Sequence, residues 1–82
     1  MATQGKAITA DTWTEVTDAS CIFQVTSRDS LYVTEQASAP TGAPGLTCKV
    51  ALYGQMYSFT ADSTKLYAYS PGDNANIAFE AV

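Results

Sequence analysis

The side chains that most often perform catalysis are scarce in this sequence. Its 82 residues include no histidine, two cysteines and eight acidic residues. Without an imidazole, neither a Ser-His-Asp nor a Cys-His arrangement is available to activate a nucleophile. A glycosidase needs two carboxylates across a cleft, but the acids here stand singly, mostly at predicted turns, and so small a domain has little room for a cleft. The sequence therefore predicts a protein that is not an enzyme and has no catalytic residues.

The same residues argue against a bound metal. A structural zinc site takes four nitrogen or sulfur ligands at close spacings, whereas Cys21 and Cys48 lie far apart in a chain without histidine. A calcium loop needs clustered acidic residues around a glycine, and carboxylates such as Asp62 and Asp73 are isolated. We therefore expect no metal and no cofactor.

The two cysteines are expected to act as small buried hydrophobic residues. In the segment 46–53, Leu46, Cys48, Val50 and Leu52 alternate with their neighbours and are predicted to form its apolar face. A Cys21–Cys48 disulfide, which would contribute about 3–4 kcal/mol, is the alternative. The first residues lack the basic and apolar regions of a secretory signal, and cytosolic thiols stay reduced. Two thiols are favoured, and the bridge remains an open alternative.

Charge and hydropathy argue against two classes of partner. The chain has four basic residues against eight acidic ones, for a net charge of −4. Nucleic-acid binding needs clustered Lys and Arg to neutralise phosphates, and no apolar run approaches the roughly 18 residues of a membrane helix. We expect neither nucleic acid nor membrane as a partner. The basic residues, all isolated, are Lys6, Arg28, Lys49 and Lys65.

Tyrosines and a proline-glycine loop over residues 37–45 are the candidates for a contact surface. Five tyrosines are many for so short a chain. Tyr is enriched where proteins meet, although cross-strand pairing on a half-exposed sheet also explains it, and aromatic platforms also bind sugars. A loop whose prolines preset its conformation loses little entropy on docking. The predicted interface residues are Tyr32, Tyr67, Tyr69, Pro40 and Pro44.

Short strands must position these side chains. Apolar and polar residues alternate with period two between turn residues, and no window has a sustained helical period. The spacing is typical of an all-β fold, a small antiparallel β-sandwich or jelly-roll-like barrel of about seven short strands. Residues 1–11 are predicted to form a flexible N-terminal arm before a single domain at 12–82. The expected strands are 13–17, 20–26, 30–36, 46–53, 56–60, 65–70 and 76–82.

Small size favours association with neighbours. A domain of this length buries only about 60–65% of the surface that its unfolded chain exposes. Such domains often depend on disulfides, a metal or neighbouring subunits. Because a metal is argued against and the disulfide is the less favoured alternative, we expect a homo-oligomer or many copies on a larger particle.

Four segments carry a resemblance that covers residues 12–82: TWTEVTDAS, CIFQVTSRDSLYVTE, ASAPTGAPG and KLYAYSPGDNANIAFEAV. In this order they resemble the small β-sandwich proteins of bacteriophage virions that decorate capsids or attach to tails. The resemblance implies a structural subunit that docks to other virion proteins, is made in the host cytoplasm and resides in the virion. The resemblance implies no catalytic or binding residues for this chain. The alternatives are a carbohydrate- or receptor-binding β-module that uses the same aromatic residues and, third, a disulfide-bonded secreted inhibitor.

Overall fold

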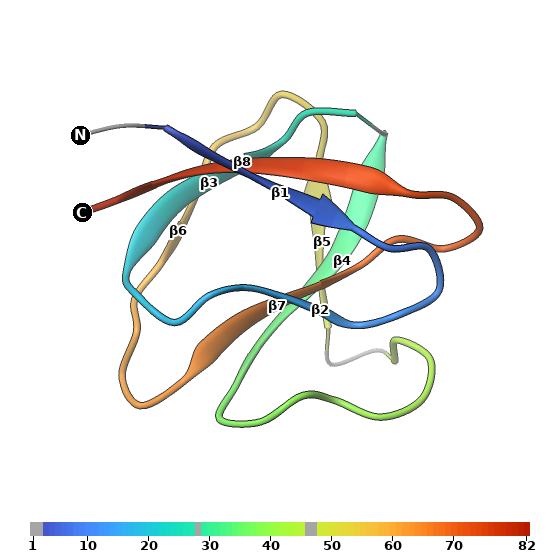
Figure 1. Ribbon diagram of the computed structural model, residues 1–82, viewed down its shortest axis with the longest axis horizontal. Helices are drawn as coiled ribbons and strands as arrows, with labels where there is room; N and C mark the ends of the chain where they lie inside the picture. The colour runs from blue at the N-terminus through green and yellow to red at the C-terminus, as the bar shows by residue number, and fades with distance from the viewer. Residues whose placement is uncertain (1–2, 28, 46–47) are drawn as a thin grey trace.

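The computed structural model describes residues 3–27, 29–45 and 48–82. Within these ranges the chain forms eight strands in two four-stranded antiparallel sheets and has no helix, so no helix spans a membrane (Figure 1). One sheet has the strand order β1-β8-β3-β6, and the other has β2-β7-β4-β5. The strands are β1 Gln4–Ile8, β2 Thr14–Thr17, β3 Cys21–Val25, β4 Ser30–Gln36, β5 Lys49–Leu52, β6 Tyr57–Phe59, β7 Lys65–Tyr69 and β8 Ala75–Ala81.

This strand order is that of a jelly roll. Consecutive strands lie in different sheets, except for β4 and β5, which pair with each other. A jelly roll consists of eight strands in two Greek keys that pack as two sheets. The prediction of a small antiparallel sandwich or jelly-roll-like barrel is therefore confirmed, with one strand more than expected.

The core lies between the sheets and is built from alternate residues of each strand. Strand β3 is typical, because Cys21, Phe23 and Val25 are buried while Ile22 points outward. Strand β8 repeats the pattern, so the period-two signal of the sequence locates both strands correctly. The buried apolar cluster comprises Ile8, Val16, Cys21, Phe23, Val25, Leu31, Val33, Ala51, Phe59, Leu66, Ala68, Ala75, Ile77 and Phe79.

The first strand corrects the expectation of a flexible arm over residues 1–11. Residues 4–8 form β1, which pairs with β8 so that Gln4 lies opposite Phe79 and Ile8 lies opposite Ala75. The side chain of Ile8 is completely buried. Because the other four residues of β1 are exposed, the local sequence has almost no apolar alternation. Pairing with β8 and the burial of one isoleucine create the strand.

Strand β5 inverts the predicted apolar face. Val50 and Leu52 are 49% and 50% exposed, whereas Ala51 is 1% exposed. The register explains the inversion, because Ala51 lies opposite Leu31, a core residue of β4. The small side chain therefore faces the core at the sheet edge and the larger ones face outward. Residues 46 and 47 of the predicted strand lie outside the described residues.

Candidate contact surface

All three predicted interface tyrosines lie on the outer face of the β2-β7-β4-β5 sheet. Tyr67 and Tyr69 alternate along β7 with the core residues Leu66 and Ala68. Tyr32 on β4 lies directly opposite Tyr69. The structure thus brings the three tyrosines together, although they come from strands far apart in the sequence.

An aromatic row crosses this face from β2 to β5. The ring centroids of Trp13 and Tyr69 lie 5.2 Å apart with a tilt of 56°. Tyr69 then lies opposite Tyr32, and Tyr32 lies opposite Val50. Cross-strand aromatic neighbours of this kind each stabilise a sheet by a few tenths to about 1 kcal/mol. The row therefore contributes to the stability of the monomer.

The proline-glycine loop folds back toward the same face. The indole Nε1–H of Trp13 donates a hydrogen bond of 2.9 Å to the carbonyl oxygen of Gly42. Pro40 and Pro44 are both half-buried. The loop joins β4 to β5 and is held to the aromatic row at its middle, so its prolines are not at the tip of a free projection.

Tyr67 is buried within the monomer, at 5% exposure. It lies opposite Glu15 of β2, and the carboxylate of Glu15 pairs at 3.7 Å with the ammonium of Lys65, two residues before Tyr67 on the same face. Tyr67 therefore has little area to offer a partner. Tyr32 and Tyr69 are half-buried and retain some accessible surface.

Exposed apolar side chains gather at the β5 edge of this sheet, where Val50 continues the row, and in the turn that follows β5. Among the described residues, six large apolar side chains are clearly exposed, and four of them fall between residues 50 and 56. Val50 and Leu52 are about half exposed, Tyr53 is 59% exposed and Met56 is 68% exposed. We call these four residues the β5–β6 surface. The sequence pattern assigns Val50 and Leu52 to the core, because alternation along β5 does not reveal which face of the strand packs against the other sheet.

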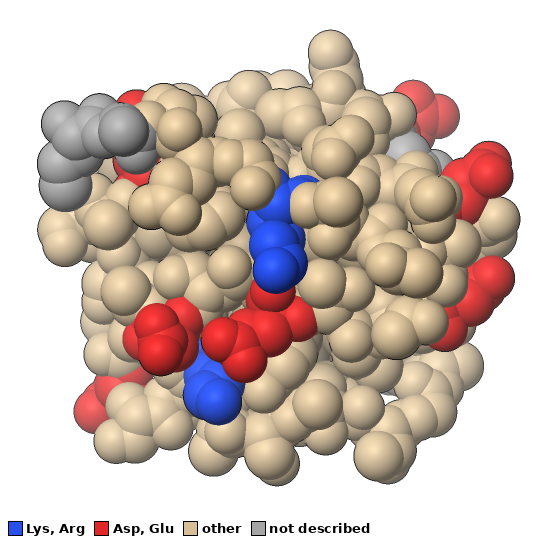
Figure 2. Space-filling model, in the orientation of Figure 1, with Lys and Arg blue, Asp and Glu red and all other residues tan. Residues whose placement is uncertain are grey.

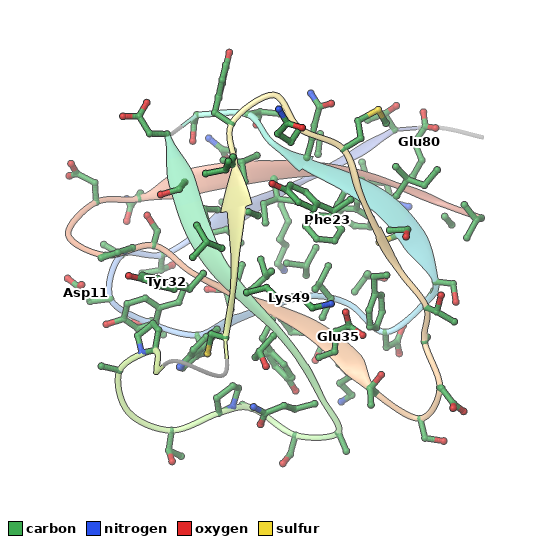
Figure 3. The ribbon with its side chains drawn as sticks, turned by 180° about the vertical axis from the view of Figure 1, so that it is seen from behind. Asp11, Phe23, Tyr32, Glu35, Lys49 and Glu80 are labelled. Atoms are coloured by element: carbon green, nitrogen blue, oxygen red, sulfur yellow. The ribbon has the colours of Figure 1, made fainter. Side chains whose placement is uncertain are left out.

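A groove adjoins the β5–β6 surface where the edge strands β5 and β6 of the two sheets face each other. It has a volume of about 470 Å³, and core side chains such as Phe23, Val33 and Ala51 line it. The ammonium of Lys49 lies 3.2 Å from the carboxylate of Glu35 at its rim (Figure 3). The core side chains at the base of this groove are themselves almost completely buried.

Tyr57 connects the two edge strands. Its ring stacks on Phe23 with centroids 5.6 Å apart and planes 27° apart. Its hydroxyl oxygen accepts a hydrogen bond of 2.8 Å from the backbone N–H of Leu52. The carbonyl oxygen of Leu52 accepts a bond from the N–H of Gln55. Both backbone groups of Leu52 are therefore bonded within the chain.

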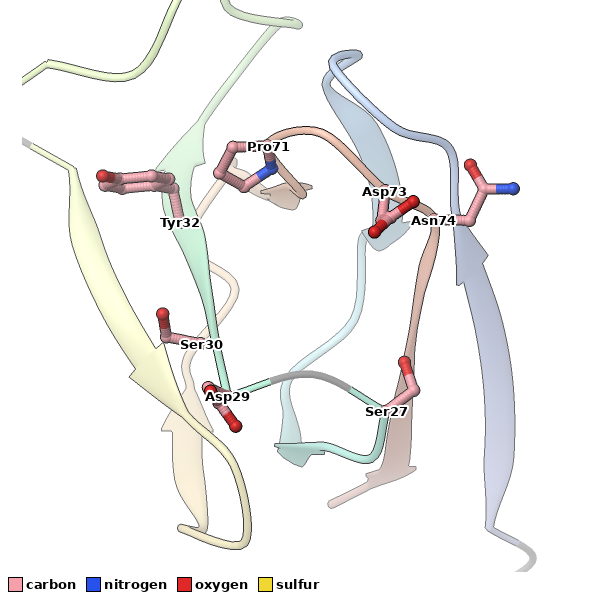
Figure 4. Close-up of a pocket in the computed structure, with 7 residues that line it drawn as sticks. All are labelled: Ser27, Asp29, Ser30, Tyr32, Pro71, Asp73 and Asn74. Carbon is pink, nitrogen blue, oxygen red and sulfur yellow. The ribbon is translucent and has the colours of Figure 1, made fainter.

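A polar hollow of about 720 Å³ lies between the β3–β4 and β7–β8 connections (Figure 4). Two of its groups already accept backbone hydrogen bonds, since Ser27 Oγ accepts from Asn76 N–H and Asn74 Oδ1 accepts from Ala10 N–H. Gly72, with φ of 83°, supplies the positive φ that a type II turn after Pro71 requires. The hollow is lined by Ser27, Asp29, Ser30, Tyr32, Pro71, Asp73 and Asn74.

The cysteines are two free thiols. Cys21 is buried, and desolvation raises the pKa of its thiol, which disfavours the nucleophilic thiolate. Cys48 is half-buried rather than fully buried. Among the described residues, no three Cys, Asp or Glu side chains gather into a metal-binding group. Comparison with known protein families, curated proteins and solved structures finds no match to this chain.

Proposed function

We propose that this chain is a non-enzymatic structural subunit of a virus particle, a capsid decoration or small tail accessory protein that acts by protein–protein docking. The observation that carries the docking role is the β5–β6 surface. Soluble proteins rarely leave large apolar side chains clustered in water unless the cluster meets another molecule. The resemblance of the sequence to phage virion proteins supports the virion as the assembly, and jelly rolls are one architecture of viral capsid domains.

The surface is suited to docking because its backbone is held in place. The Leu52 N–H bond to Tyr57 and the stack of Tyr57 on Phe23 fix β5 against the neighbouring sheet. A preorganised surface loses less conformational entropy when it binds. Tyr53 and Met56 then provide large side chains of the kind enriched at protein interfaces. Burying these apolar groups contributes about 25 cal/mol for each Å² removed from water.

The test is co-sedimentation with particles of the virus whose genome encodes the chain. Wild-type protein should sediment with particles that lack it, and Leu52→Lys should sediment much less. Val82→Lys is a matched control, because Val82 is also an exposed aliphatic residue, 71% exposed, at the end of β8 and outside the surface. Equal binding of all three proteins would rule out docking through the β5–β6 surface, and no binding by the wild type would refute the virion role.

Glycan binding at the polar hollow is the second candidate function. The hollow combines an aromatic ring, Tyr32, with the carboxylate of Asp29 and the hydroxyl of Ser30. Carboxylates accept hydrogen bonds from sugar hydroxyls, and a half-buried ring offers an apolar face. A glycan array separates the two functions. Glycan binding that is lost in Tyr32→Ala and retained in Leu52→Lys would favour this candidate, whereas an array without any specific binding would eliminate it.

A further inference from the structure

We infer that a pocket on the outer face of the β1-β8-β3-β6 sheet takes an arginine side chain from the partner that docks on the adjoining β5–β6 surface. The pocket has a volume of about 260 Å³. It adjoins that surface because Met56, one of the four residues of the β5–β6 surface, also lines the pocket. The inference rests on the proposed docking role and names the chemistry of the partner.

The outward-facing residues of the two central strands form the pocket. On β3, Ile22 and Gln24 alternate with core residues, and on β8, Ala78 and Glu80 do the same. The register places Glu80 opposite Ile22 and Ala78 opposite Gln24. Because Ala78 has the shortest of these four side chains, the face is hollow at its position and the longer side chains rise around it.

The walls of the pocket combine apolar area with one carboxylate (Figure 3). Ile22 is 38% exposed and Met56 is 68% exposed, so both offer aliphatic contact area. The carboxylate of Glu80 is exposed at the end of the pocket where Thr3 lies. Its Oε1 accepts a hydrogen bond from the hydroxyl of Thr3, which orients the carboxylate before any ligand arrives.

The carboxylate of Glu80 lacks a basic partner within the described part of the chain. Glu15 and Glu35 each pair with a lysine, whereas no basic side chain that the structure describes lies within ion-pair distance of Glu80. The whole chain has a net charge of −4, and acidic groups are spread over the face seen in Figure 2, where basic ones are few. An acidic protein attracts basic partners. A cationic side chain is therefore the group that complements this pocket.

Arginine matches the combination of apolar walls and a carboxylate. Its aliphatic stem can cover Ile22 and Met56 while its charged head reaches Glu80. A wholly apolar side chain would remove water from the carboxylate without replacing its hydrogen bonds. The guanidinium group is planar and weakly hydrated and has five N–H donors. It can therefore donate to the Glu80 carboxylate and to the amide oxygen of Gln24 together.

Titration with butylguanidinium, which has the stem and head of arginine, tests the pocket in the absence of any partner. In two-dimensional NMR spectra the backbone amide signal of Ile22 should shift and saturate with a Kd on the order of 10 mM. Pentanoate, which joins the same butyl stem to an anionic head, should cause no saturable shift. An unresponsive wild type, or an equal response to pentanoate, would overturn the inference.

Two variants locate the binding within the pocket. Ala78→Leu should abolish the shift by filling the hollow, and Asn76→Leu should leave it unchanged, because Asn76 is exposed on the same face of β8 but does not line the pocket. Glu80→Gln, which hardly changes the shape of the pocket, should raise the Kd about threefold. Circular dichroism checks that each variant keeps the wild-type sheet spectrum. Unchanged binding by Glu80→Gln would refute the role of its carboxylate.

Co-sedimentation with particles tests whether the docked partner uses the pocket. Glu80→Gln should raise the Kd for particles about threefold or more. Glu15→Gln is the matched control, because it removes the same charge from a half-exposed carboxylate on the other sheet. Equal binding by wild type and Glu80→Gln would overturn the inference and leave the docking role standing. A wild type that binds no particle would refute the proposed function, while the butylguanidinium titration still supports or overturns the pocket.

Discussion

Replacing Tyr57 with Phe isolates the hydrogen bond that joins the edges of the two sheets. The ring and its stack on Phe23 remain, so the area buried in the core hardly changes. What is lost is the bond from the Leu52 N–H to the Tyr57 hydroxyl, 2.8 Å long. A neutral hydrogen bond contributes about 0.5–1.5 kcal/mol net. Because Leu52 is 50% exposed, water can reach its freed N–H, and we expect a loss of about 1 kcal/mol in the free energy of unfolding.

Urea denaturation measures this loss, followed by circular dichroism and by the fluorescence of Trp13, the single tryptophan. A change of about 1 kcal/mol corresponds to about 4–8 °C in Tm for a domain of this size. Tyr53→Phe is the matched control. Tyr53 is 59% exposed, and removal of an exposed hydroxyl changes stability by less than about 0.5 kcal/mol. If the two variants lose the same stability, the bond between the sheets does not stabilise the fold and the reasoning is wrong.

Three further outcomes follow from the geometry. Trp13→Phe, which removes the bond to Gly42, should lower the free energy of unfolding by about 1 kcal/mol and increase cleavage of the 37–45 loop by a protease. Tyr67→Ser should lower the free energy of unfolding, measured by urea denaturation, by about 3 kcal/mol or more because the ring of Tyr67 is buried. A loss as small as that of Tyr53→Ser would contradict the burial of Tyr67. Burial raises the Cys21 pKa above its ordinary value of 9.0, so the stability that the neutral thiol contributes is complete below about pH 9 and falls as the pH rises further. Cys21→Ala should flatten that decline in thermal melts between pH 8 and about pH 11, and an unchanged slope would contradict it.

The local sequence was sufficient to predict the fold class and several strands. In β3 and β8 the buried residues alternate with exposed or half-buried ones and include the large side chains Phe23, Ile77 and Phe79, and each strand has neighbours on both sides in its sheet. Such strands bury one face whatever the rest of the chain does, so period two alone identifies the buried residues. The same signal placed Cys21 in the core.

Edge strands were harder to predict, because few of their residues are buried. β1 buries only Ile8, and no local pattern predicts its pairing with β8, about seventy residues later in the chain. β5 has apolar residues on both faces, so its alternation is compatible with either orientation. Its register with β4 placed Ala51 inward and left Val50 and Leu52 in water.

The candidate contact surface was likewise decided by tertiary structure. The sequence indicated tyrosines and a proline-glycine loop as contact residues, and the structure places Tyr32 and Tyr69 opposite each other. Tyr67, by contrast, is buried within the chain, opposite Glu15 of β2. Composition and period determine which residues alternate along a strand, but the packing of distant segments determines which of the two faces remains exposed.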